Sequence, residues 1–279
     1  AGSAVPGVDA VVQLFTGTEL VAERVQLRLG GAAGSGAVTL SSAGGDQDLA
    51  VWASLSGLDL TGAAGSGGSV TVGADLRLDS GGIVGAYLAQ DWLEATDGTT
   101  LTKSSTPAVG VYVGLPLQGG LVLDGHLGVA RPDYTVAGEE FSGRRVMGAV
   151  GVTGRWQASQ VTVRPGLRLA GYGETVAAHL SGGVTVPEER REFWSFDAVL
   201  RVEPTDPLAG GWTPYGAASV GRAVLRSSVD GRSSYDSPQA EIGVTGHLGA
   251  GVFNASLTGG AVSEGRTGLR LTLGYALAF

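Results

Sequence analysis

The chain has 279 residues, of which 43% are apolar and only 16% are charged; an ordinary soluble domain has roughly 25% charged residues. This apolar content excludes a disordered chain, and no apolar run approaches the ~20 residues that a membrane-spanning helix needs. The sequence has no cysteine, which excludes disulfides, thiolate metal sites and a cysteine nucleophile. The net charge of −8 argues against nucleic acid as a partner.

The N-terminal segment, residues 1–48, shows no strand pattern. Within it, residues 18–29 (TELVAERVQLRL) carry apolar side chains at helical spacing, with Thr18 as a candidate N-cap and Glu19 in the first turn. Gly30 supplies a stop signal for this helix. The Gly- and Ser-rich sequence that follows predicts a flexible linker up to the first strand.

From residue 49 to residue 279, apolar residues alternate with small or polar ones, which is the pattern of strands with one apolar face. In 145–156 (RVMGAVGVTGRW), for example, Val146 and Val150 share one face while Arg145 and Thr153 share the other. Such segments match the ~9–11 residues with which a tilted strand crosses a bilayer. The sequence therefore predicts an all-β fold, a transmembrane antiparallel β-barrel of about twelve strands over 49–279. The expected strands are 49–61, 69–79, 82–92, 107–117, 121–131, 144–156, 160–172, 193–203, 211–224, 239–248, 252–262 and 269–279.

A soluble sandwich or barrel would also alternate. Its solvent-facing positions would be rich in Lys and Glu, whereas the polar positions of these strands are mostly Gly, Ala, Ser and Thr. Lysine occurs once, at Lys103. The composition of the polar face therefore favours the membrane barrel over the soluble alternative.

The connections between the expected strands alternate in length. Outer-membrane barrels have short periplasmic turns and long extracellular loops, so we expect the short set, and with it both ends of the barrel, on the periplasmic side. The short connections are 79–82, 117–120, 157–160 and 248–251, and the long ones are 93–106, 131–143, 173–192 and 225–237. Connections 62–68, 204–210 and 263–268 fit this alternation less well.

Two residue types refine this picture. Tryptophans near predicted strand ends are typical of interfacial aromatic girdles; they are Trp92, Trp156, Trp194 and Trp212, while the place of Trp52 is less clear. Pro165 and Pro214 fall inside predicted strands. Because proline cannot donate to the ladder, we expect local irregularity at both.

The polar face of the strands predicts a hydrated lumen with charges of both signs. Such charges can form ion pairs across the lumen or around a plug, and the helix at 18–29 brings Glu19, Glu23, Arg24 and Arg28 as partners. We therefore expect the helix in or near the lumen, the alternative being a leader in the periplasm. The residues expected to line the lumen are Asp75, Arg77, Asp79, Asp91, Tyr112, Asp124, His126, Arg145, Arg155, Arg164, Arg168, Asp197, Arg201, Glu241, His247 and Arg270.

Taken together, a short helix, a linker, about twelve strands and the ending GLRLTLGYALAF resemble the translocator domain of the autotransporters, the type V secretion family. The segment GADLRLDSGGIVGAYLAQD at 73–91 is similar to that family's second and third strands. The resemblance covers about residues 18–279. It implies a barrel in the bacterial outer membrane, in contact with lipid and lipopolysaccharide, with a helix in the lumen that leads to an extracellular passenger polypeptide.

The resemblance also implies that the outer-membrane barrel assembly machinery recognises the last strand. The expected assembly signal is Leu271, Leu273, Tyr275, Leu277 and Phe279; lipid-facing burial would also explain these residues. Only about seventeen residues precede the helix. The passenger is therefore either cleaved or outside this sequence, or the protein is a stand-alone outer-membrane barrel that acts as a small channel or as a structural or adhesive protein.

A catalytic function is the third interpretation of the sequence. Asp124 and His126 share one face of a strand and could orient a general base, but the next residue on that face is Gly128, where an outer-membrane phospholipase carries serine. We expect a polar network in the lumen and no catalytic residue. The acidic pairs 139–140 and 188–189 are expected to be solvated charges, so neither a metal nor a cofactor is predicted.

Overall fold

The computed structural model describes residues 21–22, 24–26, 28–29, 49–61, 65–97, 100–181, 184–229, 231–263 and 266–278. Several predictions lie outside these residues: the N-cap at Thr18, Glu19 and Glu23 as partners of the lumen charges, the stop at Gly30 with the linker that follows it, and the final residue of the assembly signal, Phe279. The described part of the chain contains no helix that is both long and apolar enough to cross a membrane.

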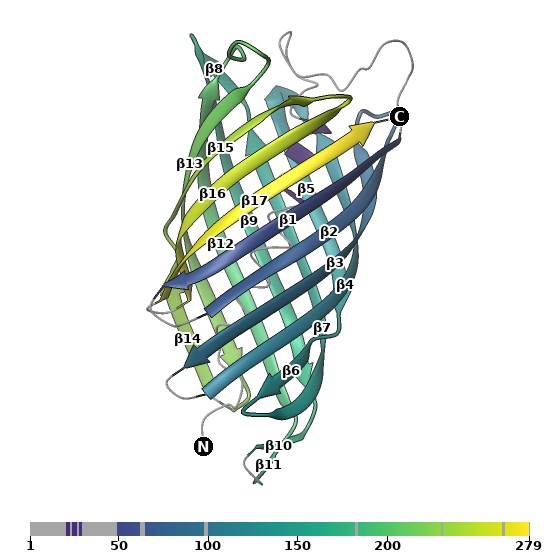
Figure 1. Cartoon of the computed structure of the whole chain (residues 1–279). Helices are drawn as coiled ribbons and strands as arrows, with labels where there is room; N and C mark the ends of the chain where they lie inside the picture. Colours follow the sequence, from purple (N-terminus) through teal and green to yellow (C-terminus); the bar gives the residue numbers. More distant parts are fainter. Residues whose placement is uncertain are drawn as a thin grey trace.

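The strands form a closed antiparallel barrel of 12 strands (Figure 1). Closure comes from the first and last strands, which pair from Ala50 opposite Ala278 to Thr61 opposite Thr267. The prediction of an all-β barrel of about twelve strands is thus confirmed. The barrel strands are β1 Leu49–Thr61, β2 Gly65–Arg77, β3 Ile83–Asp97, β4 Thr100–Pro116, β5 Leu121–Ala130, β7 Glu139–Gly154, β9 Val161–Val176, β12 Glu189–Pro204, β13 Thr213–Ser227, β15 Gln239–Leu248, β16 Gly251–Ser263 and β17 Arg266–Ala278.

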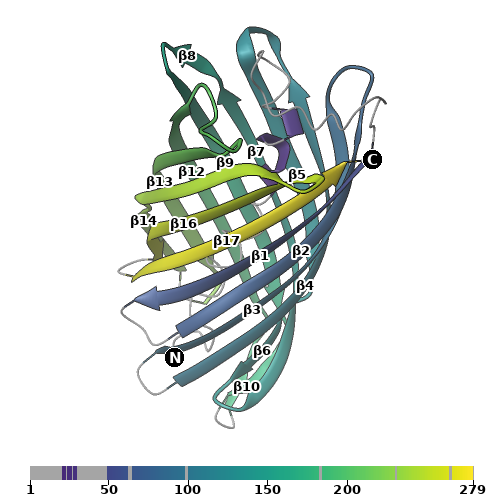
Figure 2. The same cartoon turned by 45° about the horizontal axis from the view of Figure 1, so that its top comes forward.

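We call the end of the barrel where β1 begins and β17 ends the terminal end. Short connections join the strands at this end, and one of them contains the 3-10 turn η1 (Gln118–Gly120). The opposite end carries hairpin extensions of the wall (Figures 1 and 2). The short strands of this opposite end are β6 Asp133–Val136, β10 His179–Ser181, β11 Val184–Val186 and β14 Gly231–Asp236. The short strand β8 Trp156–Ala158 belongs to the β7–β9 connection at the terminal end (Figure 1).

The long loops that the sequence predicts at this opposite end are largely strand. β3 and β4 continue to Asp97 and Thr100, and β6 pairs with β7 around a tight turn at Ala137 and Gly138, both with positive φ. The alternation of hydropathy stops where lipid contact stops, whereas Ser- and Thr-rich sequence still completes the hydrogen-bond ladder in water. The predicted boundaries therefore followed the apolar band and missed the ends of the hairpins.

The two faces of the wall differ as a membrane barrel requires. On β1, Val51 and Leu55 point outward and are exposed, while Trp52, Ser54 and Ser56 point inward and are buried. Of the four tryptophans predicted to form interfacial girdles, three are exposed on the outer face: Trp92, Trp156 and Trp194. The unassigned Trp52 instead lies inside the barrel, 6% exposed.

The irregularity expected at the prolines is found on one side of each only, because β12 pairs in unbroken register past Pro165 and β15 past Pro214 on the other side. Each proline lies where the ladder on its other side stops. The pairing of β7 with β9 stops at Gly166 and resumes beyond Pro165 only between β8 and β9, at Val163. The pairing of β12 with β13 stops at Gly216. A missing N–H therefore leaves no partner unpaired in the middle of the sheet.

Glycines inside the barrel leave room for aromatic rings from neighbouring strands. Gly85 on β3 lies beneath the ring of Tyr112 on β4, and Gly110 on β4 lies beneath the ring of Tyr87 on β3. Each of the two strands thus carries a ring that covers a glycine of the other. Gly243 and Tyr215 form the same arrangement further around the wall. Covering a bare strand backbone with a cross-strand ring is a known way to stabilise a strand glycine, and it explains part of the high glycine content.

This arrangement predicts that Gly85→Ala lowers the stability of the barrel. The new Cβ would overlap the Tyr112 ring, and that ring is held by hydrogen bonds to Trp52 and Asp75. Overpacking of this kind costs about 1–3 kcal/mol. The measurement is the temperature at which the barrel loses its folded mobility on a gel. Gly57→Ala is the matched control, because its Cβ meets no atom within 4 Å; equal shifts in the two variants would contradict this account.

Candidate functional site

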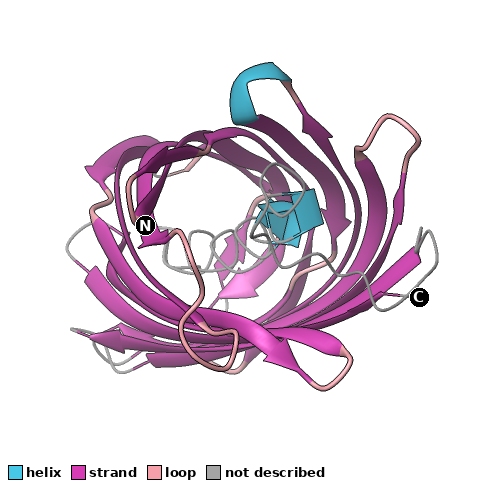
Figure 3. Cartoon of the chain, turned by 90° about the horizontal axis from the view of Figure 1, so that it is seen from above, coloured by secondary structure: helices cyan, strands magenta, loops and turns pink. Residues whose placement is uncertain are grey.

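The candidate site is the lumen and the helix inside it. The described residues of 21–29 are helical and lie within the ring of strands (Figure 3). Val21, Val25 and Leu29 form one apolar stripe and are at most 2% exposed. The described part of the predicted helix is thus confirmed, and so is its place in or near the lumen.

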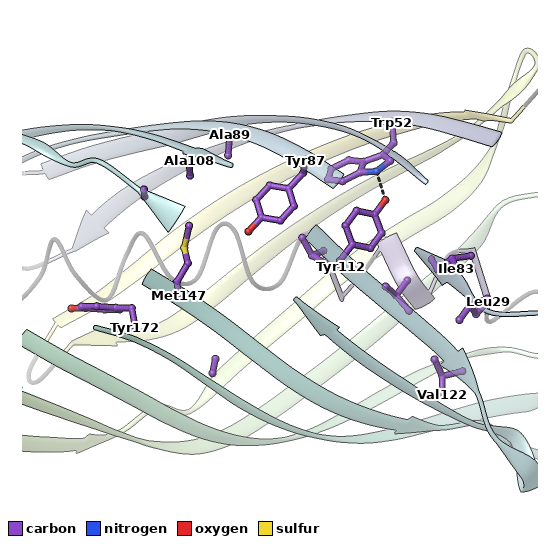
Figure 4. Packing of buried hydrophobic residues seen from close by; sticks show 14 of the residues in the cluster. Leu29, Trp52, Ile83, Tyr87, Ala89, Ala108, Tyr112, Val122, Met147 and Tyr172 are labelled. Carbon is purple, nitrogen blue, oxygen red and sulfur yellow. Dashed lines mark hydrogen bonds between the residues drawn. The ribbon is translucent and has the colours of Figure 1, made fainter. Parts of the chain in front are cut away.

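The apolar stripe packs against a cluster on the inner wall. Figure 4 shows Leu29 beside Ile83, with Tyr112 and Trp52 deeper in the barrel. A Cβ added at Gly114 would overlap Val25. Gly114 therefore lets the helix pack directly against the backbone of β4, and the helix lies against one side of the lumen.

Charge fixes the helix at the same place. The carboxylate of Asp75 on β2 accepts a hydrogen bond from Nε of Arg24 at 2.7 Å and another from Nε of Arg28 at 3.1 Å. Tyr112 donates a third at 2.8 Å, and Trp52 in turn donates to the Tyr112 hydroxyl at 2.7 Å. Asp75 is 1% exposed. One buried carboxylate therefore holds two cations of the helix, and such charge-assisted bonds are strong only while both partners are present.

The helix has a defined polarity. Arg77, the last residue of β2, donates from Nη2 to the backbone carbonyl of Arg28 at 3.3 Å. A cation at the C-terminal end of a helix also interacts favourably with the helix dipole. Since Arg77 stands at the terminal end of the barrel and Asp75 lies further in, the C-terminal end of the helix faces the terminal end. Its N-terminal end faces the opposite mouth.

A cavity of about 240 Å³ lies on the other side of the helix. Ala22 and Gln26 of the helix form one side of it, and the facing wall combines small residues with the arginines Arg164, Arg168 and Arg201. The helix thus covers the aromatic wall of β1–β5 and leaves the charged wall of β9 and β12 free. The lumen is only partly filled by the described residues.

The charges along this wall are paired with one another. Arg168 contacts Asp124 at 2.8 Å, and Glu203 accepts from both Arg164 at 2.7 Å and Arg201 at 3.0 Å. Arg201 also lies 3.4 Å from the centre of the Tyr215 ring, whose hydroxyl donates to Glu241 at 2.6 Å. This network stiffens the wall and keeps its polar groups at the cavity.

A second network lies toward the opposite mouth. Glu174 accepts from Arg145 at 2.7 Å and from the hydroxyl of Tyr134 at 2.6 Å. Close by on β12, Arg191 contacts Glu189 at 2.7 Å. The side chains of Arg145 and Glu174 are 2% and 0% exposed, so this pair is sealed from water.

The predicted lumen residues fall into three groups in the structure. Asp75, Asp91, Tyr112, Asp124, His126, Arg145 and Arg270 are buried; Arg77, Arg155, Arg164, Arg168, Asp197, Arg201 and Glu241 are partly buried. Asp79 and His247 are exposed, because Asp79 stands in the β2–β3 turn and His247 stands beside the β15–β16 turn. Asp79 is the correction, since it lies outside the strands, whereas His247 keeps the inward side of its buried register partner Val252. Of the expected assembly residues, Leu271 is exposed on the outside, and Leu273, Tyr275 and Leu277 are partly exposed.

Sequence reasoning missed several members of these networks. Glu174, Glu189 and Arg191 lie beyond the strand ends that it predicted, at 172 and 193. Glu203 is the last residue of a predicted strand and lies on the same face as Arg201. Alternation along this strand therefore predicts that Glu203 faces the lumen. Trp52 also follows the inward parity of Ser54 and Ser56 on β1.

The arrangement of Asp124 and His126 does not favour a catalytic role. Oδ2 of Asp124 and Nε2 of His126 each lack a hydrogen-bond partner among the described residues, so the two side chains do not form the pair that a general base needs. Asp124 is instead bound to Arg168. Across the described ranges there is no group of His, Asp and Glu side chains with the spacing of a metal site.

The closed wall, the apolar outer face and the polar lumen define the fold class as that of bacterial outer-membrane barrels. No protein-family model and no curated protein matches the sequence. Among solved structures, the chain is similar to the β-domain of the Bordetella autotransporter BrkA, with a TM-score of 0.68 and 19% identity over 83% of this chain and 100% of that one.

It is also similar to the translocator domain of the autotransporter NalP from Neisseria meningitidis, with a TM-score of 0.67 and 14% identity over 99% of this chain and 100% of that one. A third similar structure is an outer membrane channel from Pseudomonas putida F1, with a TM-score of 0.56 and 11% identity over 86% of this chain and 100% of that one. The chain therefore has the fold of an autotransporter translocator barrel, as the sequence resemblance led us to expect.

Proposed function

We propose that the chain is an outer-membrane translocator of the autotransporter type, which anchors in the membrane and holds a polypeptide in its hydrated lumen. The observation that carries this proposal is the polarity of the docked helix. Its C-terminal end lies near the terminal end, where β1 begins, and its N-terminal end faces the opposite mouth. A polypeptide that precedes the helix would thus be directed through the barrel.

The wall supplies the physical means. Every backbone group of a closed barrel is paired within the ladder, so the outer face needs only apolar side chains to remain in lipid. The lumen offers paired charges and a cavity of about 240 Å³ beside the helix. A polar chain can pass such a lining without transferring its charges into hydrocarbon. In this proposal the terminal end faces the periplasm.

An epitope fused before Ala1 tests the proposal in cells that express the full chain. We expect a protease or antibody added to intact cells to reach the epitope. The same epitope inserted in the 249–250 turn at the terminal end is the matched control, and it should be reached only after the outer membrane is opened. An N-terminal epitope that stays protected while an epitope in the Ala137–Gly138 turn is accessible would contradict the translocator role and favour a stand-alone barrel.

The cavity beside the helix supports the second candidate, a small channel without a passenger. The similarity to the Pseudomonas putida channel is at the level of fold. A channel predicts that the N-terminal epitope gives no surface signal while the intact chain still conducts ions. The epitope experiment therefore separates the two functions.

We further propose that β17 is the strand that the outer-membrane assembly machinery recognises. It pairs with both β1 and β16, so its placement closes the barrel. Leu271, Leu273, Tyr275 and Leu277 lie on one face of it, followed by Phe279. Polar substitutions at Leu271 and Leu273 would reduce the amount of folded barrel in cells but not its folding into detergent, if this recognition role is correct.

A further inference from the structure

The exposed cations of the protein are distributed unevenly. Every exposed lysine or arginine in the described ranges lies in the half of the barrel away from the terminal end, and none lies near the short turns. They are Lys103, Arg131, Arg144, Arg190, Arg222, Arg226 and Arg232. A chain with a net charge of −8 therefore places its exposed positive charge at one membrane surface.

Strand register gathers four of these arginines on one sector of the outer wall. Arg144 on β7 and Arg190 on β12 are both register partners of Thr175 on β9. Arg226 on β13 is the register partner of Arg232 on β14 and of Glu192 on β12. Neighbouring strands lie ~5 Å apart, so the four arginines form a row from β7 to β14 in which adjacent long side chains can reach one ligand. We call Arg144, Arg190, Arg226 and Arg232 the arginine patch.

The patch begins where the apolar outer face ends. The next outward residue after Arg144 is Val146, which is 62% exposed, and the next after Glu192 is Trp194, which is 52% exposed. Phe196 follows on β12 and is also exposed. Tryptophan on the outer wall of a barrel marks the level of lipid headgroups, so the arginines lie at that level or just beyond it.

The patch carries an excess of positive charge. Arg144, Arg226 and Arg232 have no ion-pair partner among the residues that the structure describes. Arg190 is 3.8 Å from Glu188, and both of these side chains are largely exposed, so this contact is weak. Glu192 and the exposed Glu140 are further carboxylates on this sector. The nearby Arg222 already contacts Asp236 at 3.6 Å.

We propose that the arginine patch binds a phosphate-bearing lipid of the surrounding leaflet, with the chemistry of lipid A. Guanidinium groups recognise phosphate through paired N–H donors, and the acyl chains of such a lipid would lie along Val146 and Phe196. The assignment to the outer leaflet rests on the proposed orientation, in which the terminal end is periplasmic. The patch would then fix the depth and rotation of the barrel in its membrane.

The test titrates the detergent-solubilised full chain with lipid A and counts bound lipid by native mass spectrometry. We expect the double variant Arg144→Gln/Arg226→Gln to bind lipid A roughly thirtyfold more weakly, since each basic residue at an anionic lipid surface contributes ~1 kcal/mol. The matched control, Lys103→Gln/Arg131→Gln, removes the same number of charges at the same end of the barrel outside the patch. It should bind as the native chain does.

Equal weakening in both double variants would overturn the proposal, because the attraction would then come from overall charge. Unchanged binding in the Arg144→Gln/Arg226→Gln variant would overturn it as well. Inorganic phosphate separates the headgroup from the free ion: loss of lipid binding at millimolar phosphate contradicts a lipid site, and retained binding supports it. This experiment uses no surface epitope, so a failed translocator test with intact lipid A binding would refute the translocator role and leave the lipid site standing.

Discussion

Replacing Asp75 by Asn is expected to destabilise the docked helix by about 3–5 kcal/mol, the usual cost of removing one member of a buried ion pair. The carboxylate serves Arg24 and Arg28 together, and all three side chains are at most 4% exposed. An amide keeps the shape but cannot balance two cations. We therefore expect the helix to leave its place on β2–β4 and both arginines to become accessible.

Trypsin measures this release directly, because it cleaves after arginine. The variant should be cut after Arg24 or Arg28 under conditions that leave the native chain intact. Asp79→Asn is the matched control, since Asp79 lies four positions along in an exposed turn and should not change the cleavage. In the triple variant Arg24→Gln/Arg28→Gln/Asp75→Asn, the thermal stability should recover toward the native value. Independent, additive losses would contradict the shared role of Asp75.

Glu174→Gln is expected to have the next largest effect, again about 3–5 kcal/mol, but on the wall itself. Glu174 receives hydrogen bonds from Arg145 and Tyr134, and the side chains of the ion pair are almost completely buried. Substitution leaves the Arg145 guanidinium without its carboxylate in a sealed part of the barrel. We expect a lower unfolding temperature, measured by the loss of folded mobility on a gel.

An exposed pair on the same barrel gives the control for this variant. Lys103 and Glu94 are 2.9 Å apart, but their side chains are 52% and 53% exposed, so Glu94→Gln should cost at most about 1 kcal/mol. If Glu174→Gln and Glu94→Gln lower the unfolding temperature equally, burial does not determine how much these ion pairs stabilise the barrel. The role given to Glu174 in the second network would then be wrong.

The sequence predicted the barrel well because alternation is a property of each strand by itself. β1 and β15 have the predicted bounds, and the inward parity of Asp75, Asp124 and Arg145 follows from period two. Strand ends such as Val176 and Glu189 were missed because hydropathy changes at the edge of the lipid, whereas strand pairing continues beyond it. Periodicity therefore measures the membrane-crossing part of a strand, not its full length.

The site was predicted less completely, because its contacts depend on which walls face each other. Parity places Arg168 and Asp124 inside the barrel, but their contact across strands depends on the stagger of the closed sheet. That both helix arginines meet one carboxylate cannot be deduced from spacing either. Asp79 lies in a turn, where the alternation that assigned it no longer applies. His247 keeps the inward side of β15 but is exposed because it lies next to a turn.

Single-channel conductance in planar bilayers is the measurement that shows whether the N-terminal helix occupies the lumen. The comparison is between the full chain and a chain that starts at Gln47, after a gel has shown that the shorter barrel is folded. We expect a much larger conductance for the shorter chain, because it lacks the helix that packs against Gly114 and Asp75. Equal conductance of the two would contradict this placement of the helix, since the helix would then lie outside the conducting path.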